Sequence, residues 1–97
     1  MLLILRVLCS GPLHGYAIAQ RIHTLSRAAL EVEEGSLYPA LQKLLLKGWV
    51  TASWTVSESG RRVRCYRLTR QGREQLDVEV RDFERVTGAI RQVLRTA

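Results

Sequence analysis

The last third of the chain carries an apolar stripe whose members recur at alternating intervals of four and three residues. This heptad pattern is typical of a long helix that buries one face against another helix. Val86 and Val93 widen the stripe, whose members are Leu76, Val80, Phe83, Thr87, Ile90, Leu94 and Ala97. A chain of 97 residues forms a single domain with a modest core, too small to cover so long a stripe. We therefore predict that this helix buries its stripe in a dimer.

Three shorter helices are predicted upstream of that segment. Residues 1–9 form an apolar run that ends at the helix-breaking sequence Ser10-Gly11-Pro12. This first helix has no N-cap residue before it, which is compatible with the loss of a few upstream residues. Residues 15–25 repeat apolar side chains at helical spacing, and residues 26–34 form a connector with an acidic end. The third helix is expected to begin near Gly35-Ser36 and to end at Lys47-Gly48, because glycine suits the position just after a helix.

The third helix is predicted to have one apolar and one polar face. Its apolar face, expected in the core, consists of Leu37, Ala40, Leu41 and Leu44. Its exposed face consists of Ser36, Tyr38, Pro39, Gln42 and Lys43. Pro39 is expected within about the first turn, where a backbone N–H needs no helical partner. Leu45 and Leu46 are expected to form an exposed apolar pair.

A β-hairpin is predicted between the third helix and the last one. Residues 57–60 have the composition of a turn, and residues 61–68 that of the return strand. Thr69 is the expected N-cap of a last helix over about residues 70–95. Residues 49–56 alternate in polarity, and one face of this strand is expected to carry Val50, Ala52, Trp54 and Val56.

Several single residues have simple structural interpretations. We expect Tyr16 and Trp54 to pack in the core or between elements rather than to stack on bases. His14, just before the second helix, is expected to cap that helix or to lie in a turn, and His23 is expected at the surface. Cys65 is expected to have no redox role. Two distant cysteines without metal-ligand spacing predict no disulfide, metal site or cofactor, as suits a reducing cytoplasm.

Three helices followed by a two-stranded hairpin is the order of a winged helix-turn-helix, a mainly α fold of the α+β class. Such a domain places its third helix in the DNA major groove and its hairpin, the wing, along the adjacent backbone. The net charge is +6, and the first 69 residues hold nine cations against four acids. The last helix, with six cations and five acids, is nearly neutral. We predict a DNA-binding domain over residues 1–69 and a dimerisation helix over residues 70–97.

The exposed face of the third helix and the hairpin supply the candidate DNA contacts. Gln42 can pair with adenine, and hydroxyls or cations can reach base edges and phosphates. Four arginines within seven residues suit phosphate or minor-groove contact, although Arg67 alternates to the other face and is expected to be structural. The predicted DNA-binding residues are Ser36, Tyr38, Pro39, Gln42, Lys43, Arg61, Arg62 and Arg64. The alternative is that these side chains form only a solvated surface.

Other function classes find less support in the sequence. An enzyme is not predicted, because no carboxylate pair, Ser-His-Asp arrangement or glycine-rich phosphate loop is readable. The chain has no secretory signal pattern and no apolar run of the ~20 residues that a membrane span requires, so a cytoplasmic protein is expected. The second hypothesis is a protein-interaction or ligand-sensing module with only weak DNA binding, suggested by the Leu45-Leu46 pair.

Several short motifs occur together along the chain. They are Gly11-Pro12-Leu13-His14-Gly15-Tyr16, Glu34-Gly35-Ser36-Leu37-Tyr38-Pro39-Ala40-Leu41, Lys47-Gly48-Trp49-Val50, Gly60-Arg61-Arg62, and Tyr66-Arg67-Leu68-Thr69 with Gly72. In combination they resemble the PadR family of bacterial transcriptional regulators, over nearly the whole chain. The length resembles the short PadR subfamily, which has one dimerisation helix. The resemblance implies a ligand-responsive, homodimeric repressor that binds a pseudo-palindromic operator in double-stranded DNA.

The same resemblance implies a recognition helix that begins near residues 35–38 and a wing around residues 60–62. It also implies an effector space between protomers, lined by the first and last helices, that suits a small aromatic molecule. Family members often carry tryptophan where Phe83 stands, and a phenyl ring is smaller and has no hydrogen-bond donor. The residues expected at the dimer interface or the effector are Leu76, Val80, Phe83, Val86, Thr87, Ile90 and Leu94.

Overall fold

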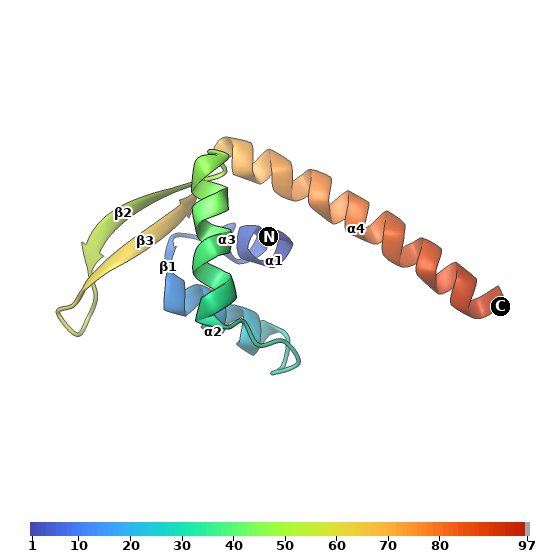
Figure 1. The fold of residues 1–97 in the computed structure, drawn as a ribbon, viewed down its shortest axis with the longest axis horizontal. Helices are drawn as coiled ribbons and strands as arrows, with labels where there is room; N and C mark the ends of the chain where they lie inside the picture. Colours follow the sequence, from blue (N-terminus) through green and yellow to red (C-terminus); the bar gives the residue numbers. More distant parts are fainter. Residues whose placement is uncertain (97) are drawn as a thin grey trace.

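A β-hairpin and a long C-terminal helix project in different directions from a small helical body (Figure 1). The computed structural model describes residues 1–96, so Ala97, the last member of the predicted stripe, lies outside the described residues. The elements are α1 (Leu2–Leu8), β1 (Leu13–His14), α2 (Gly15–Leu25), α3 (Glu34–Leu46), β2 (Val50–Val56), β3 (Arg62–Leu68) and α4 (Arg70–Thr96). This order confirms the predicted winged helix-turn-helix with a C-terminal helix.

The sheet has three antiparallel strands in the order β1-β3-β2, whereas the sequence predicted only the hairpin of β2 and β3. The additional strand β1 pairs Leu13 with Tyr66 and His14 with Cys65. The prediction missed β1 because two residues are too few to show an alternation of polarity. This short pairing ties the start of α2 to the middle of the hairpin.

α3 supplies the most completely buried side chains of the core. Leu37, Leu41 and Leu44 have no exposed surface, and Ala40 lies half-buried at the edge of the same face. The predicted apolar face of this helix is therefore confirmed. The remaining buried side chains of the core are Ile4, Leu5, Val7, Leu8, Ile18, Ile22, Val50, Tyr66 and Leu76. Burial of a leucine stabilises a fold by about 1.5–3 kcal/mol, so this face sets the orientation of α3 and of its exposed face.

The start of α3 differs from the prediction. The helix begins at Glu34, a residue expected in the acidic connector, and this carboxylate lies in the first turn, where the helix dipole favours a negative charge. Pro39 was expected within about the first turn, but it is the sixth residue of the helix and lies beyond that turn. It therefore cannot donate the helical hydrogen bond to the carbonyl of Gly35. Gly35 is exposed, so water can donate to that carbonyl instead.

Two side chains cap helices as predicted. His14 precedes α2, and its Nδ1 accepts a hydrogen bond from the backbone N–H of Ala17 at 3.3 Å. Thr69 precedes α4, and its Oγ1 accepts from the backbone N–H of Gly72 at 3.0 Å. The same Thr69 hydroxyl donates to the carbonyl of Gly48 at 2.7 Å. This bond joins the start of α4 to the end of α3.

α4 packs on the body only through its first turns. Gly72 and Leu76 are buried, and Val80 packs against the core. Gly72 lies so close to the carbonyl of Trp49 that a Cβ at this position would overlap the carbonyl oxygen. Beyond Val80 the helix extends away from the body (Figure 1), and the molecule reaches 56 Å in its longest dimension. Most of the predicted stripe therefore has no partner within residues 1–96.

Candidate nucleic-acid interface

The exposed face of α3 carries the side chains predicted from the sequence. Because the opposite face is buried, this polar face is held in one orientation toward solvent. Within residues 1–96, no side-chain hydrogen bond or ion pair engages Gln42 or Lys43. Their donors and acceptors are free for an external ligand. The five predicted residues, all exposed, are Ser36, Tyr38, Pro39, Gln42 and Lys43.

Tyr38 has a structural role that the sequence did not reveal. Its ring and hydroxyl lie against Gly15 at the start of α2, where an added Cβ would come within 2.8 Å of the hydroxyl. The side chain remains 44% exposed. Tyr38 therefore joins α2 to α3 and still presents part of its ring on the outer face of α3. The only sign of this contact in the sequence is the glycine at position 15. The sequence does not show which side chain fills the space there, because Tyr38 lies in another helix.

The connector between α2 and α3 has an unusual backbone. Arg27 and Ala28 adopt positive φ angles of 53° and 65°. Non-glycine residues seldom adopt this left-handed conformation. Ser26 stabilises the turn, because its Oγ accepts from the backbone N–H of Leu30 at 3.0 Å and donates to the carbonyl of His23 at 3.1 Å. His23 is exposed, as predicted. The connector thus sets how α3 follows α2.

The wing, here residues 50–68, carries its arginines on two faces. The register pairs Trp54 with Arg64 and Val56 with Arg62. Since paired residues share a face and side chains alternate, these four lie on the face that contacts the core at the base of the hairpin. Arg67 lies on the opposite face, as predicted. Arg61 precedes β3 and is exposed.

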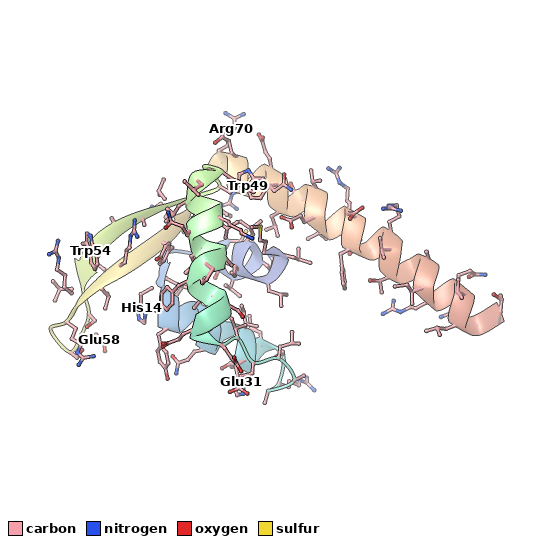
Figure 2. The ribbon with its side chains drawn as sticks, in the orientation of Figure 1. His14, Glu31, Trp49, Trp54, Glu58 and Arg70 are labelled. Carbon is pink, nitrogen blue, oxygen red and sulfur yellow. The ribbon has the colours of Figure 1, made fainter. Side chains whose placement is uncertain are left out.

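Trp54 and Tyr16 were predicted to pack in the core or between elements, and both are instead largely exposed. Both are 59% exposed. Trp54 lies on the projecting half of the hairpin (Figure 2), beyond Ala52, where no helix covers the sheet. The alternation of polarity correctly placed Trp54 on the same face of the sheet as Val50. That face is exposed at Trp54 because the hairpin extends beyond the core. Tyr16 lies in the first turn of α2, and its hydroxyl accepts a long hydrogen bond of 3.5 Å from Gln20.

The cations of the candidate interface have no acidic partner in the described part of the chain. Within residues 1–96, the two ion pairs are Arg70–Glu74 and Arg85–Asp82, and both lie in α4. The arginines of the wing and Lys43 therefore have no carboxylate that an external anion would have to displace. Arg62 lies 4.9 Å above the ring of Trp54, and Arg64 lies 5.9 Å from the ring of Tyr66.

The predicted Leu45-Leu46 pair is only half correct. Leu45 packs against the core, whereas Leu46 is 78% exposed. The difference follows from the helical spacing, because residue 45 lies one turn after Leu41 on the edge of the buried face. A single exposed leucine does not form a surface patch.

The remaining candidate chemistry is sparse. Both cysteines are free, and Arg73 donates a hydrogen bond to the Sγ of Cys9 at 3.2 Å. In the described part of the chain, no three His, Cys, Asp or Glu side chains lie close enough together to hold a metal ion. Of the helices over residues 1–96, none combines the length and the apolar character that a membrane crossing needs.

α4 borders two depressions in the region predicted for the dimer and the effector, one of them mainly apolar and the other of mixed character. One lies on the outer half of the helix and is lined by Arg85, Val86, Ala89, Ile90, Val93 and Leu94. The other lies where α4 meets α1 and is lined by Arg6, Leu76, Asp77, Val80 and Arg81. Phe83 lies between the two along the helix and is 56% exposed. Thr87 is half-buried.

The fold and the exposed face of α3 define a winged-helix protein of the kind found among transcriptional regulators. The chain belongs to the PadR-like family of transcriptional regulators, because the sequence model of that family matches residues 4–78. The match extends from α1 to the first turns of α4 and confirms the resemblance inferred from the motifs. Members of this family are regulators of transcription.

Individual relatives agree with this assignment. An uncharacterised 37.1 kDa protein of a Streptomyces fradiae transposon is 40% identical over 89 residues, which are 92% of this chain and 24% of the relative. The chain thus spans about a quarter of that relative's length. A solved PadR-family transcription regulator from Clostridium difficile is 25% identical, with a TM-score of 0.80 over 96% of this chain and 95% of that chain. Bacillus subtilis PadR, solved in complex with operator DNA, is 26% identical, with a TM-score of 0.72 over 81% of this chain and 44% of that chain.

Proposed function

We propose that this chain is a sequence-specific DNA-binding transcriptional regulator that acts as a homodimeric repressor on a pseudo-palindromic operator. The observation that carries the proposal is the unpaired polar face of α3 beside a wing whose arginines have no acidic partner within residues 1–96. Family membership supports it, and so does the similarity to Bacillus subtilis PadR, which has been solved with operator DNA.

In this proposal α3 reads bases and the wing binds the backbone. Gln42 pairs with adenine in the major groove, while Ser36 and Lys43 reach base edges or phosphates. The guanidinium groups of the wing match phosphate oxygens with paired N–H donors. Tyr38 and Pro39 supply apolar contact at the same face. The proposed DNA-binding residues are Ser36, Tyr38, Pro39, Gln42, Lys43, Arg61, Arg62 and Arg64.

We assign residues 1–69 to DNA binding and residues 70–97 to dimerisation. The exposed apolar stripe of α4 supports this division, because water disfavours an apolar surface of this size. Gly72 and Leu76 also complete the core of the first part, so the boundary separates roles rather than folding units. The proposed interface and effector residues are Leu76, Val80, Phe83, Val86, Thr87, Ile90 and Leu94.

A small aromatic effector fits the depression between α1 and α4 once a second protomer closes it. Leu76 and Val80 supply apolar walls, while Arg6, Arg81 and Asp77 supply two cations and one carboxylate around them. Effector binding there would act on the relative orientation of the two α4 helices, and therefore on the spacing of the two α3 helices.

Fluorescence anisotropy with DNA from upstream of the protein's own gene, against a scrambled duplex at two salt concentrations, tests the proposal. We expect the upstream DNA to bind at least about a hundredfold more tightly. Arg61→Ala should weaken binding to both duplexes and reduce the salt slope by about one unit. Gln42→Ala should reduce the preference for the upstream DNA. Equal, steeply salt-dependent binding of both duplexes would contradict sequence-specific recognition of this DNA.

The alternative function is a protein-interaction module with weak DNA binding. The observation that favours it is the exposed Leu46 at the end of α3. In that case Leu46→Glu should abolish capture of a partner protein, whereas Gln42→Ala should have no effect on it. Retention of the partner by Leu46→Glu would remove this alternative.

A further inference from the structure

The wing contains a stacked pair of side chains that the fold does not require. Trp54 is 59% exposed and lies beyond the part of the sheet that the helices cover. The guanidinium carbon of Arg62 lies 4.9 Å from the centre of its ring. Arg62 is also exposed. An exposed indole in this position contributes little to the core, so its contact with Arg62 is the feature to explain.

The stacking changes how Arg62 presents its charge. A cation over the face of an indole is attracted by the negative potential of the ring, and tryptophan is the strongest partner for this contact. The guanidinium is shielded from solvent on the side of the ring, and within residues 1–96 none of its N–H groups makes a side-chain hydrogen bond or ion pair. A free arginine side chain samples many rotamers, and binding must select one of them. Trp54 removes part of that cost before a ligand arrives.

The charges of the wing indicate where along the hairpin an anion would bind. Glu58 is the one acidic residue between positions 50 and 68, and it lies in the turn at the tip (Figure 2). A carboxylate there disfavours a phosphate at the tip itself. Arg62 and Arg64 lie on the flank that continues the core face, together with Trp54 and Val56. This flank combines two guanidinium groups with exposed apolar surface, as a sugar-phosphate backbone requires.

We propose that Trp54 is the positioning residue of the wing, holding the Arg62 guanidinium ready for a backbone phosphate of DNA. Trp54 and Val56 contact the adjacent deoxyribose, and the flank of the wing, continued by Arg61 at its outer end, binds the DNA, whereas the turn around Glu58 does not. This inference rests on the proposed function and names the part of the DNA that the wing binds.

The test is a double-mutant cycle on the same anisotropy measurement with the upstream DNA. Trp54→Ala should weaken binding about 3–10-fold, because Arg62 is no longer held over the ring. Its salt slope should stay unchanged, since no charge is lost. Arg62→Ala should weaken binding and lower the slope by about one unit. In the Arg62→Ala background, Trp54→Ala should cost less than about twofold, because the apolar contact alone remains.

Two further variants separate positioning from folding. Trp54→Phe keeps an aromatic face and should restore most of the affinity lost in Trp54→Ala. Thr55→Ala is the matched control, because Thr55 is the neighbouring exposed residue on the opposite face of β2, and its affinity should equal that of the wild type. The thermal unfolding midpoints of all variants should agree within about 4 degrees, since these side chains lie outside the core.

The outcomes distinguish this inference from the function on which it rests. If the wild type binds the DNA and Trp54→Ala binds equally well, the positioning role is wrong and the proposed function stands. The same conclusion follows if Trp54→Ala costs as much without Arg62 as with it. If Glu58→Ala strengthens binding by a larger factor than that by which Trp54→Ala weakens it, the carboxylate faces the phosphates, and the tip rather than the flank contacts the backbone. Failure of the wild type to bind either duplex would remove both proposals.

Discussion

α3 and α4 are both amphipathic helices, yet one completes its burial within the chain and the other does not. α3 buries Leu41 and its neighbours completely, because α1, α2 and the base of the sheet enclose it. α4 leaves the body after Val80, so Phe83 is 56% exposed and Leu94 is 75% exposed. A helical repeat of apolar residues thus predicts that one face is buried, but it does not show whether the same chain or a second copy buries it.

The largest expected effect lies in the enclosed helix. Leu41→Ala should lower the free energy of unfolding by about 3–4 kcal/mol, because it leaves a cavity in the middle of the core. Urea denaturation followed by circular dichroism measures this loss. Leu46→Ala in the same helix is the control and should change stability by less than about 0.5 kcal/mol, since Leu46 is exposed. Similar losses of unfolding free energy in both variants would show that the two faces of α3 do not differ in their contribution to stability.

The second prediction tests whether a partner covers the open helix. Phe83→Ala should weaken dimerisation by about 2–4 kcal/mol, as for an aromatic ring buried between two protomers. Sedimentation equilibrium measures the change. Glu84→Ala, the next residue along α4 and exposed, should leave the dimer unchanged. A wild-type chain that remains monomeric at tens of micromolar would show that α4 has no second copy to cover it.

The third prediction concerns the junction where the two helices meet. Gly72→Ala should destabilise the fold by about 2 kcal/mol, because the new Cβ overlaps the backbone carbonyl of Trp49. Gly88→Ala is the control, since a Cβ there meets nothing within 4 Å. In an open helix position this change should stabilise by about 0.5–1 kcal/mol. The two variants should therefore shift the unfolding midpoint in opposite directions.

The smallest effect is expected at the cap of α4. Thr69→Ala removes the bonds to Gly72 and Gly48 and should cost about 1 kcal/mol of stability. Thermal unfolding measures this loss, and Thr69→Ser should recover most of it because the hydroxyl is retained. A loss in Thr69→Ser as large as that in Thr69→Ala would mean that the threonine methyl group, not the cap, supports the junction.

The helices and strands of this chain were largely predictable from the sequence, whereas the contacts between them were not. α2 has the predicted bounds, and Thr69 and His14 cap helices as expected, because caps and helical periods depend on neighbouring residues. The strand β1 was missed because it is defined by its pairing with β3, which lies about 50 residues further along the chain. The exposed polar face of α3 was predictable from its spacing alone.

The candidate site divides in the same way. The arginines of the wing and the polar residues of α3 could be read from the sequence. The contact of Arg62 with Trp54 could not, because it depends on the register of β2 with β3 and on where the core ends. The same limit led to the wrong prediction that Trp54 packs in the core.

The order and spacing of neighbouring residues specify which segments become helices and strands, which faces are apolar, and the family to which the chain belongs. The extent of the core is a property of the folded molecule: the core encloses α3, ends after Ala52 in the hairpin and ends after Val80 in α4. The reason is that burial depends on the shape of the whole assembly of elements, whereas a pattern records only which side of one element is ready to be buried.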